Sequence, residues 1–271
     1  MKIYFLILNA LLIIMCMILS CNNDSPVTNP KSSVPIIPYT YVDSFPHDIN
    51  SFTEGFSFYK GNLWESTGAT ENFTQTRSLF GITDLKTGKI DVKSELDRNK
   101  FFGEGITILN GKIYQLTYKN KVGFVYDTLT FKKIKEFPIP VQEGWGLTND
   151  GKHLIMSDGT GKLTFLDPED LKVVKQLNVT IDGYTCEKLN ELEHIKGFIY
   201  ANIWTTRHIV KINPVTGEVV GKLDFTELAE DAKRINPGIA EMNGIAWDSL
   251  TDRIMITGKL WPKIYQVKFN H

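Results

Sequence analysis

The 271-residue chain has only three cysteines, Cys16, Cys21 and Cys186, which excludes a disulfide scaffold. No four Cys or His residues occur at the tight spacing of a zinc finger. An excess of charge is also absent, since 30 Lys and Arg stand against 31 Asp and Glu, so nothing points to a nucleic acid partner. The chain does have a 42% hydrophobic fraction, which is enough for a core and excludes wholesale disorder. Its length suits one large all-β domain or two smaller domains.

The longest apolar run lies at the N-terminus. After Lys2, residues 3–19 are almost wholly apolar, and their length favours a secretory signal peptide over residues 1–20 rather than a membrane-spanning helix. Ile18-Leu19-Ser20-Cys21 resembles a bacterial lipobox, in which the signal is cleaved before the cysteine and the cysteine is acylated. The Pro-, Ser- and Asn-rich stretch after it predicts a flexible tether over 21–37. We therefore expect a protein of the bacterial cell envelope, anchored to a membrane through lipid on Cys21 and facing the periplasm or another extracytoplasmic space.

Five related stretches recur along the rest of the chain. They are Phe52-Thr53-Glu54-Gly55-Phe56, Phe102-Gly103-Glu104-Gly105-Ile106, Gly144-Trp145-Gly146-Leu147, Leu189-Asn190-Glu191-Leu192 and Met242-Asn243-Gly244-Ile245. Further runs rich in β-branched and aromatic residues follow each stretch. Four short strands per unit, at a spacing of about 41–53 residues, are typical of a β-propeller blade. Residues 38–271 are therefore predicted to form an all-β, five-bladed propeller; a β-sandwich does not explain the repeated unit.

The two ends of this domain predict how the ring closes. Residues 264–269 supply the third strand of the last blade, and no fourth strand follows them. Residues 39–45 read as an unpaired strand, so we expect them to complete that blade and cover its edge. A short helical insertion is expected near 225–235, with Asp224 as its cap and residues 236–238 as its end.

The repeated stretches also predict a site. In a propeller the loops that enter the innermost strands form one face, and each stretch occupies that position. The residues expected to converge around one opening are Glu54, Glu104, Trp145, Asn190, Glu191 and Asn243, joined by the aromatic residues Phe52, Phe102, Tyr118, Trp204 and Trp261. One glutamate alone would more often only hydrate a channel, whereas the whole set points to function. Aromatic walls exclude water and raise the pKa of a nearby carboxyl group, as acid/base catalysis at neutral pH requires.

At these positions the sequence resembles the glutaminyl-peptide cyclotransferases of the plant and bacterial type, which are five-bladed propellers. The resemblance runs from about Pro46 to Phe269. It is carried by Phe101–Gly105, Val122–Asp127, Glu143–Leu147, Leu189–Glu193, Ala201–Trp204, Asn243–Asp248 and Thr257–Pro262. It implies that N-terminal glutaminyl residues of peptides or proteins cyclise to pyroglutamyl (5-oxoproline) residues with release of ammonia. It also implies that no cofactor is required and that, unlike in the animal enzymes, catalysis does not depend on zinc.

The resemblance assigns roles to individual residues. Glu104 matches the acid/base glutamate. The pocket wall and polar clamps are matched by Phe52, Phe102, Trp145, Asn190, Trp204 and Lys259, with Asn190 and Lys259 placed to bind the amide or the developing oxyanion. Glu54 and Tyr118 depart from the family, which usually has Gln and Trp there, and loop Ala69–Arg77 differs from its usual short turn. Glu54 either repels ionised Glu104 and raises the pKa of the pair, or pairs with the substrate's ammonium group.

Two other classes of function stay open on the sequence alone. One is a metal-dependent, lactonase-like hydrolase in which Glu54, Asn190 and Asn243 bind calcium, although such propellers usually have six blades. The other is a non-catalytic binding module, a common use of propellers. Whichever function applies, we expect a monomer, because a closed ring of blades gives no reason for an obligate dimer.

Overall fold

The computed structural model describes residues 33–271, of which residues 34–271 form one compact unit. The predicted signal peptide and Cys21 lie outside the described residues. Within residues 33–271, no helix is both long enough and apolar enough to cross a membrane. The unit consists mainly of five four-stranded antiparallel sheets, as predicted for a five-bladed propeller.

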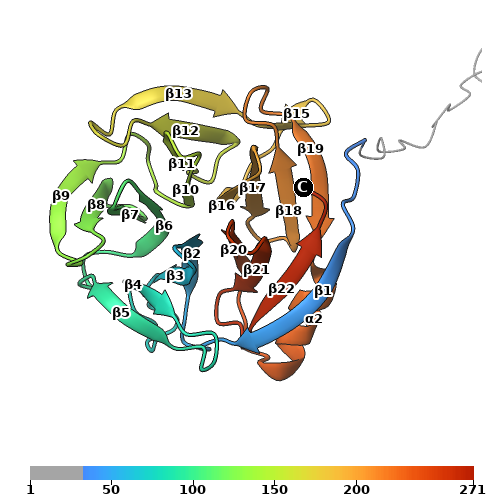
Figure 1. Ribbon diagram of the computed structural model, residues 1–271, viewed down its shortest axis with the longest axis horizontal. Coiled ribbons are helices and arrows are strands. Elements are labelled where there is room, and N and C mark those ends of the chain that lie inside the picture. The colour runs from blue at the N-terminus through green and yellow to red at the C-terminus, as the bar shows by residue number, and fades with distance from the viewer. Residues whose placement is uncertain (1–32) are drawn as a thin grey trace, which may run out of the picture. The chain divides into compact units, whose positions relative to one another are not determined.

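Each sheet is one blade, and the blades follow one another around the ring (Figure 1). The first comprises β2 (Thr53–Tyr59), β3 (Asn62–Thr67), β4 (Leu79–Thr83) and β5 (Ile90–Glu95). The second comprises β6 (Gly103–Leu109), β7 (Lys112–Thr117), β8 (Val122–Asp127) and β9 (Lys133–Pro138). The third comprises β10 (Leu147–Asn149), β11 (Leu154–Met156), β12 (Lys162–Leu166) and β13 (Val173–Asn178). A two-stranded hairpin follows it, β14 (Thr180–Ile181) with β15 (Tyr184–Thr185).

The fourth blade comprises β16 (Leu189–Ile195), β17 (Phe198–Ile203), β18 (His208–Ile212) and β19 (Val219–Asp224). The fifth comprises β20 (Met242–Asp248), β21 (Arg253–Gly258), β22 (Lys263–Phe269) and β1 (Tyr39–Pro46). In this last blade β1 pairs antiparallel with β22, with Tyr39 opposite Phe269 and Pro46 opposite Lys263. The predicted closure of the ring by both ends of the domain is therefore confirmed.

The propeller unit begins earlier than the sequence indicated. Ile37 N donates to Lys222 O at 2.8 Å, and Lys222 N donates to Pro35 O at 3.0 Å, so residues 35–37 lie along the edge of β19. The Ile37 side chain occupies the space left by the missing side chain of Gly221. The tether predicted over 21–37 therefore does not extend through its last residues.

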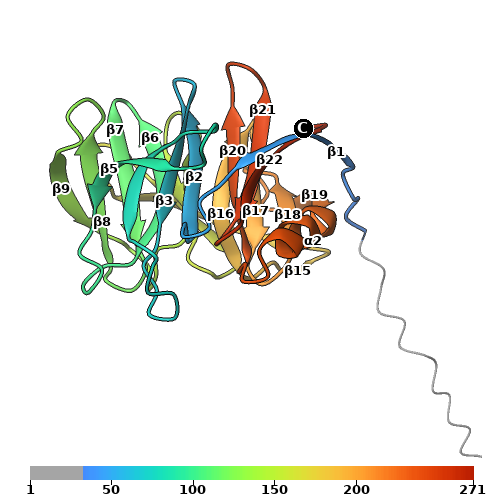
Figure 2. The ribbon, with the colours of Figure 1, turned by 90° about the horizontal axis from the view of Figure 1, so that it is seen from below.

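The predicted insertion is confirmed as helix α2 (Thr226–Ile235), which lies at the edge of the ring near β19 (Figure 2). Its N-cap is Phe225 rather than Asp224, so the expected cap is one residue too early. Asp224 accepts hydrogen bonds from the backbone and hydroxyl of Thr226, the first residue of the helix. The helix buries Leu228, Ala229 and Ala232 in the core shared by the last two blades. It ends at Asn236, as expected.

The innermost strands approach one another closely because glycines replace side chains there. A Cβ atom on Gly105 would lie 2.4 Å from Leu147 N, and one on Gly146 would lie 2.1 Å from Asn190 O. The fourth repeat has Glu191 in place of the glycine. Its buried carboxylate accepts hydrogen bonds from Ile245 N (2.8 Å) and Phe56 N (3.1 Å). Glu191 thus links three inner strands across the centre of the ring.

Candidate active site

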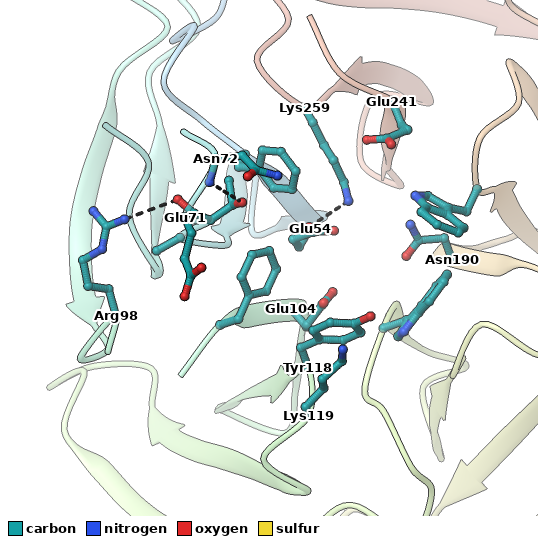
Figure 3. A pocket seen from close by; sticks show the side chains of 16 residues that line it. Glu54, Glu71, Asn72, Arg98, Glu104, Tyr118, Lys119, Asn190, Glu241 and Lys259 are labelled. Atoms are coloured by element: carbon teal, nitrogen blue, oxygen red, sulfur yellow. Dashed lines mark hydrogen bonds and ion pairs between the residues drawn. The ribbon is translucent and has the colours of Figure 1, made fainter. Parts of the chain in front are cut away.

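A cavity of about 730 Å³ is formed by residues from all five blades and their connecting loops (Figure 3). It is lined by Phe52, Glu54, Ala69, Thr70, Glu71, Asn72, Arg98, Phe102, Glu104, Tyr118, Lys119, Trp145, Asn190, Trp204, Glu241 and Lys259. The structure therefore brings together most of the residues that the sequence singled out. They come from positions up to 207 residues apart, from Phe52 to Lys259, because each repeat delivers its residues to the same end of the ring.

Three of the predicted residues do not line the cavity. Glu191 fills the centre of the ring through its bonds to neighbouring backbones. Asn243 is buried, and its amide donates to Thr53 O (2.9 Å) and Glu54 Oε2 (3.2 Å). Trp261 turns away into the core, where its ring lies against Gly258 and its Nε1 donates to Ala240 O at 3.2 Å. Glu191 and Asn243 therefore support the cavity from behind, and Trp261 supports the turn that carries Lys259.

Aromatic rings form two walls of the cavity. Phe102 packs edge-on against Phe52, with centroids 6.0 Å apart, and lies 5.9 Å from Tyr118. On the other side Trp145 and Trp204 pack edge-to-face at 5.6 Å. These walls leave the side chains between them little water, which raises the energy of any charge placed there.

Glu104 lies between these walls and is only 5% exposed. Its backbone is fixed, since Ser66 Oγ donates to Glu104 O at 2.6 Å and Gly105 N donates to Trp145 O at 2.8 Å. In the part of the chain that the structure describes, no group donates a hydrogen bond to its carboxylate. Burial, reinforced by the charge of Glu54, raises the pKa of Glu104 well above its usual value. The site thus holds a carboxyl group whose raised pKa makes it a better proton acceptor than an ordinary carboxylate.

A buried ion pair lies next to Glu104. Lys259 Nζ is 2.8 Å from Glu54 Oε1 and 4.7 Å from the centroid of the Phe52 ring. Burial raises the pKa of Glu54 to about 7, although Lys259 opposes this shift. Burial lowers the pKa of Lys259, but the charges of Glu54 and Glu104 raise it above its usual value, so the amine stays protonated. Both Glu54 oxygens already have partners, Lys259 and Asn243, which favours repulsion of Glu104 over capture of the substrate's ammonium group.

Asn190 offers the cavity an unused acceptor. Its residue is 3% exposed, and its Oδ1 is buried without a hydrogen-bond partner. Ser157 Oγ donates to Asn190 O at 2.7 Å and holds its backbone in place. Because buried polar atoms are nearly always hydrogen-bonded, this oxygen is suited to accept an N–H group from a ligand.

The rim of the cavity contains residues that the repeats did not predict: Thr70, Glu71, Asn72, Arg98, Lys119 and Glu241. Arg98 donates to Thr74 O (2.7 Å), Thr76 O (3.2 Å) and Thr70 O (3.3 Å), and so fixes the loop after β3. The loop Ala69–Arg77, whose sequence differs from the family's usual short turn, supplies Ala69, Thr70, Glu71 and Asn72 to the cavity. Arg98 and Glu241 lie outside the repeated stretches, and no sequence pattern marked them.

The residues proposed as calcium ligands do not form a ligand set. The ammonium group of Lys259 lies against Glu54, where a metal cation would have to sit. Asn243 turns its amide N–H, a donor, toward the same carboxylate. The described residues 33–271 also contain no cluster of three or more His, Cys, Asp or Glu side chains arranged to hold a metal ion.

Comparisons with known proteins agree with this geometry. The family model described as glutamine cyclotransferase matches residues 10–269. A glutaminyl-peptide cyclotransferase of Arabidopsis thaliana is 40% identical over 230 residues, which cover 84% of this chain and 70% of that protein. The crystal structure of Myxococcus xanthus glutaminyl cyclase matches with a TM-score of 0.79 at 31% identity, covering 87% of this chain and 98% of the other. This chain belongs to the glutamine cyclotransferase family.

Proposed function

We propose that the cavity converts an N-terminal glutaminyl residue of a peptide into a pyroglutamyl residue with release of ammonia, and that Glu104 is its acid/base. The observation that carries this proposal is a buried carboxyl group of raised pKa, without a hydrogen-bond donor, beside a cation and an unpaired amide oxygen. The attacking amine and the amide carbon belong to the same residue. The site therefore has to hold one folded-back conformer and move protons.

The residues divide this work among them. Glu104 takes a proton from the attacking α-nitrogen and delivers a proton to the amide nitrogen, which leaves as ammonia, so the carboxylate is regenerated. Lys259 uses one hydrogen for Glu54 and can direct another to the amide oxygen, where negative charge develops. Asn190 Oδ1 accepts an N–H group of the substrate, and the aromatic walls pack against its methylene groups.

The raised pKa of Glu104 has a direct energetic consequence. The α-nitrogen must attack as a neutral amine. A free α-ammonium group has a pKa near 8, so transfer of its proton to an ordinary carboxylate with a pKa near 4.3 costs about 5 kcal/mol. Each pKa unit by which burial closes that gap removes about 1.4 kcal/mol from this cost. The dry, negatively charged surroundings of Glu104 thus make its carboxylate a stronger base toward the α-amino group of the substrate.

Incubation of the purified full chain with a Gln-initiated peptide tests the function. We expect the peptide to lose the mass of one ammonia, with equal release of free ammonia, and an N-acetylated copy of the same peptide to stay unchanged. Cleavage of the peptide, or binding without a change of mass, would favour the hydrolase or the binding module instead. Repeating the assay with a chelator separates the metal-dependent hydrolase from the proposed reaction.

Replacement of Glu54 changes the pH profile in a defined direction. Glu54→Gln removes a negative charge that raises the Glu104 pKa, so the acid limb of kcat/KM should move to lower pH. Rates measured from about pH 5 to pH 9 locate this limb. Glu227→Gln, at an exposed position of α2, is the charge-matched control and should leave the limb in place. An unchanged limb in Glu54→Gln would show that the two carboxyl groups are not coupled.

We also propose, from the sequence alone, that the enzyme is held at a bacterial membrane by lipid on Cys21 and acts on peptides outside the cytoplasm. The lipobox-like segment before Cys21 and the polar stretch after it support this location. Incorporation of labelled fatty acid that depends on Cys21 tests the proposal.

A further inference from the structure

A second buried ion pair lies outside the cavity, where the first blade meets the fifth. His47 follows β1, at the start of the segment that connects the last blade to the first. His47 Nε2 lies 3.0 Å from Glu65 Oε1 on β3, and His47 Nδ1 lies 2.8 Å from Trp261 O. Both side chains of the pair are 0% exposed.

The contacts of this pair fix its charge. A carboxylate oxygen and a carbonyl oxygen face the two ring nitrogens of His47, so both nitrogens must carry a hydrogen. Glu65 also accepts hydrogen bonds from Thr53 Oγ1 (2.8 Å) and Thr83 Oγ1 (2.9 Å), which suit a carboxylate. Burial lowers the pKa of His47, but Glu65, the Trp261 carbonyl and Asp48 raise it above its usual value. Glu65 and Asp48 are the charged groups that face His47, and its cationic form is favoured.

This pair binds residues that lie close in the chain to both halves of the cavity's own ion pair, Lys259 and Glu54. On one side, His47 N donates to Pro262 O at 3.0 Å and its ring binds Trp261 O, so it holds the turn that carries Lys259. Leu260 in that turn has a φ of 60°, a left-handed conformation that needs support from its surroundings. On the other side, Glu65 binds Thr53, which lies between Phe52 and Glu54 in the chain.

We propose that His47 and Glu65 are positioning residues that hold the Lys259 turn in register with the strand that carries Glu54. This proposal rests on the proposed function, because it assigns the pair a role in placing Lys259 for the reaction. The two elements come from opposite ends of the domain, and the pair spans the junction between them. An apolar pair of the same size would fill the space but would not bind Trp261 O and Thr53 Oγ1 together.

His47→Gln tests the proposal, because both N–H groups of glutamine lie on one nitrogen, whereas His47 reaches Trp261 O and Glu65 Oε1 from two separate ring nitrogens. We expect kcat/KM for a Gln-initiated peptide to fall about ten- to a hundredfold. The assay is run at a temperature well below the melting temperature of the variant, so that unfolding does not contribute to the loss. In a Lys259→Met background the same substitution should change the residual rate by less than about twofold, since the group that it positions is gone. His153→Gln, which removes a partly buried pair with Asp150 outside the cavity, is the matched control and should leave kcat/KM unchanged.

Equal losses in both backgrounds, or no loss in either, would overturn the positioning role. If His47→Gln does not fold, Glu65→Gln replaces it, with a smaller loss that should again vanish in the Lys259→Met background. Glu65 Oε1 accepts from both His47 and Thr53, so an amide oxygen there keeps both bonds and removes the charge that favours the cationic ring. Nitrogen-15 NMR of histidine-labelled protein gives a readout that needs no activity. One histidine, absent from His47→Gln, should carry protons on both ring nitrogens at neutral pH, and a neutral ring would overturn the proposal. A wild-type protein that leaves the peptide unchanged would refute the proposed function instead.

Discussion

Glu104→Gln is expected to reduce kcat by about 10²–10⁴-fold while the protein becomes no less stable. Glutamine keeps the shape of the side chain but cannot shuttle a proton. Burial raises the Glu104 pKa, so the folded state binds this proton more tightly than the unfolded chain does. Ionisation therefore opposes folding at any pH above the unfolded value near 4.3, and an uncharged side chain removes that cost. Ammonia release and thermal unfolding, measured at the same pH, check the two expectations.

The matched control for Glu104→Gln is Glu193→Gln. Burial raises the pKa of Glu193 to about 8, but this carboxylate accepts from Trp247 N (2.8 Å) and Thr148 Oγ1 (3.2 Å) and does not line the cavity. Its replacement should change kcat by less than about twofold, since only a group in contact with the substrate transfers a proton in the reaction. Full cyclisation by folded Glu104→Gln, or equal losses in both variants, would remove Glu104 from the mechanism.

The ring could be predicted from the sequence because one physical requirement recurs around it. Neighbouring inner strands touch at Gly55, Gly105 and Gly146, where a Cβ atom would lie within 2.5 Å of the next strand's backbone. Gly244 marks the same position in the fifth repeat, and Glu191 replaces the glycine in the fourth. The closure of the ring could also be predicted from the sequence. Residues 39–45 form a strand without a partner, the last blade lacks its outer strand, and pairing the two satisfies both. These features depend on backbone spacing, which a sequence shows directly.

Side-chain direction could not be predicted in the same way. Glu54 and Asn243 precede the glycine of their repeats, yet one lines the cavity and the other binds to it from behind. Glu191 stands where the glycine is expected, and its carboxylate bridges the backbones of two other strands, which no sequence pattern indicates. The direction of Trp261 depends on the left-handed residue Leu260 before it, which no pattern marks. His47 and Glu65 meet across a seam that the repeats do not describe.

Lys259→Met should destabilise the folded protein by about 3–5 kcal/mol at alkaline pH, besides weakening catalysis. It removes the cation that stabilises ionised Glu54 in a fully buried position. The Glu54 pKa, already raised to about 7 by burial, should then rise further. Because a raised carboxyl pKa favours the protonated folded state, stability relative to wild type should fall as the pH increases from about 6 to 9. Chemical denaturation at several pH values measures this dependence.

The double variant Glu54→Gln/Lys259→Met separates the buried charge from lost packing. With no carboxylate left at position 54, the alkaline loss of stability should disappear, and any constant loss measures the changed contact with the Phe52 ring. Activity should not return with stability, because the double variant still lacks the cation that binds the amide oxygen. If the double variant lost as much stability at high pH as Lys259→Met alone, another buried carboxyl group would have to be the source. The next variant to measure would then replace Glu104, whose charge also raises the pKa of Lys259.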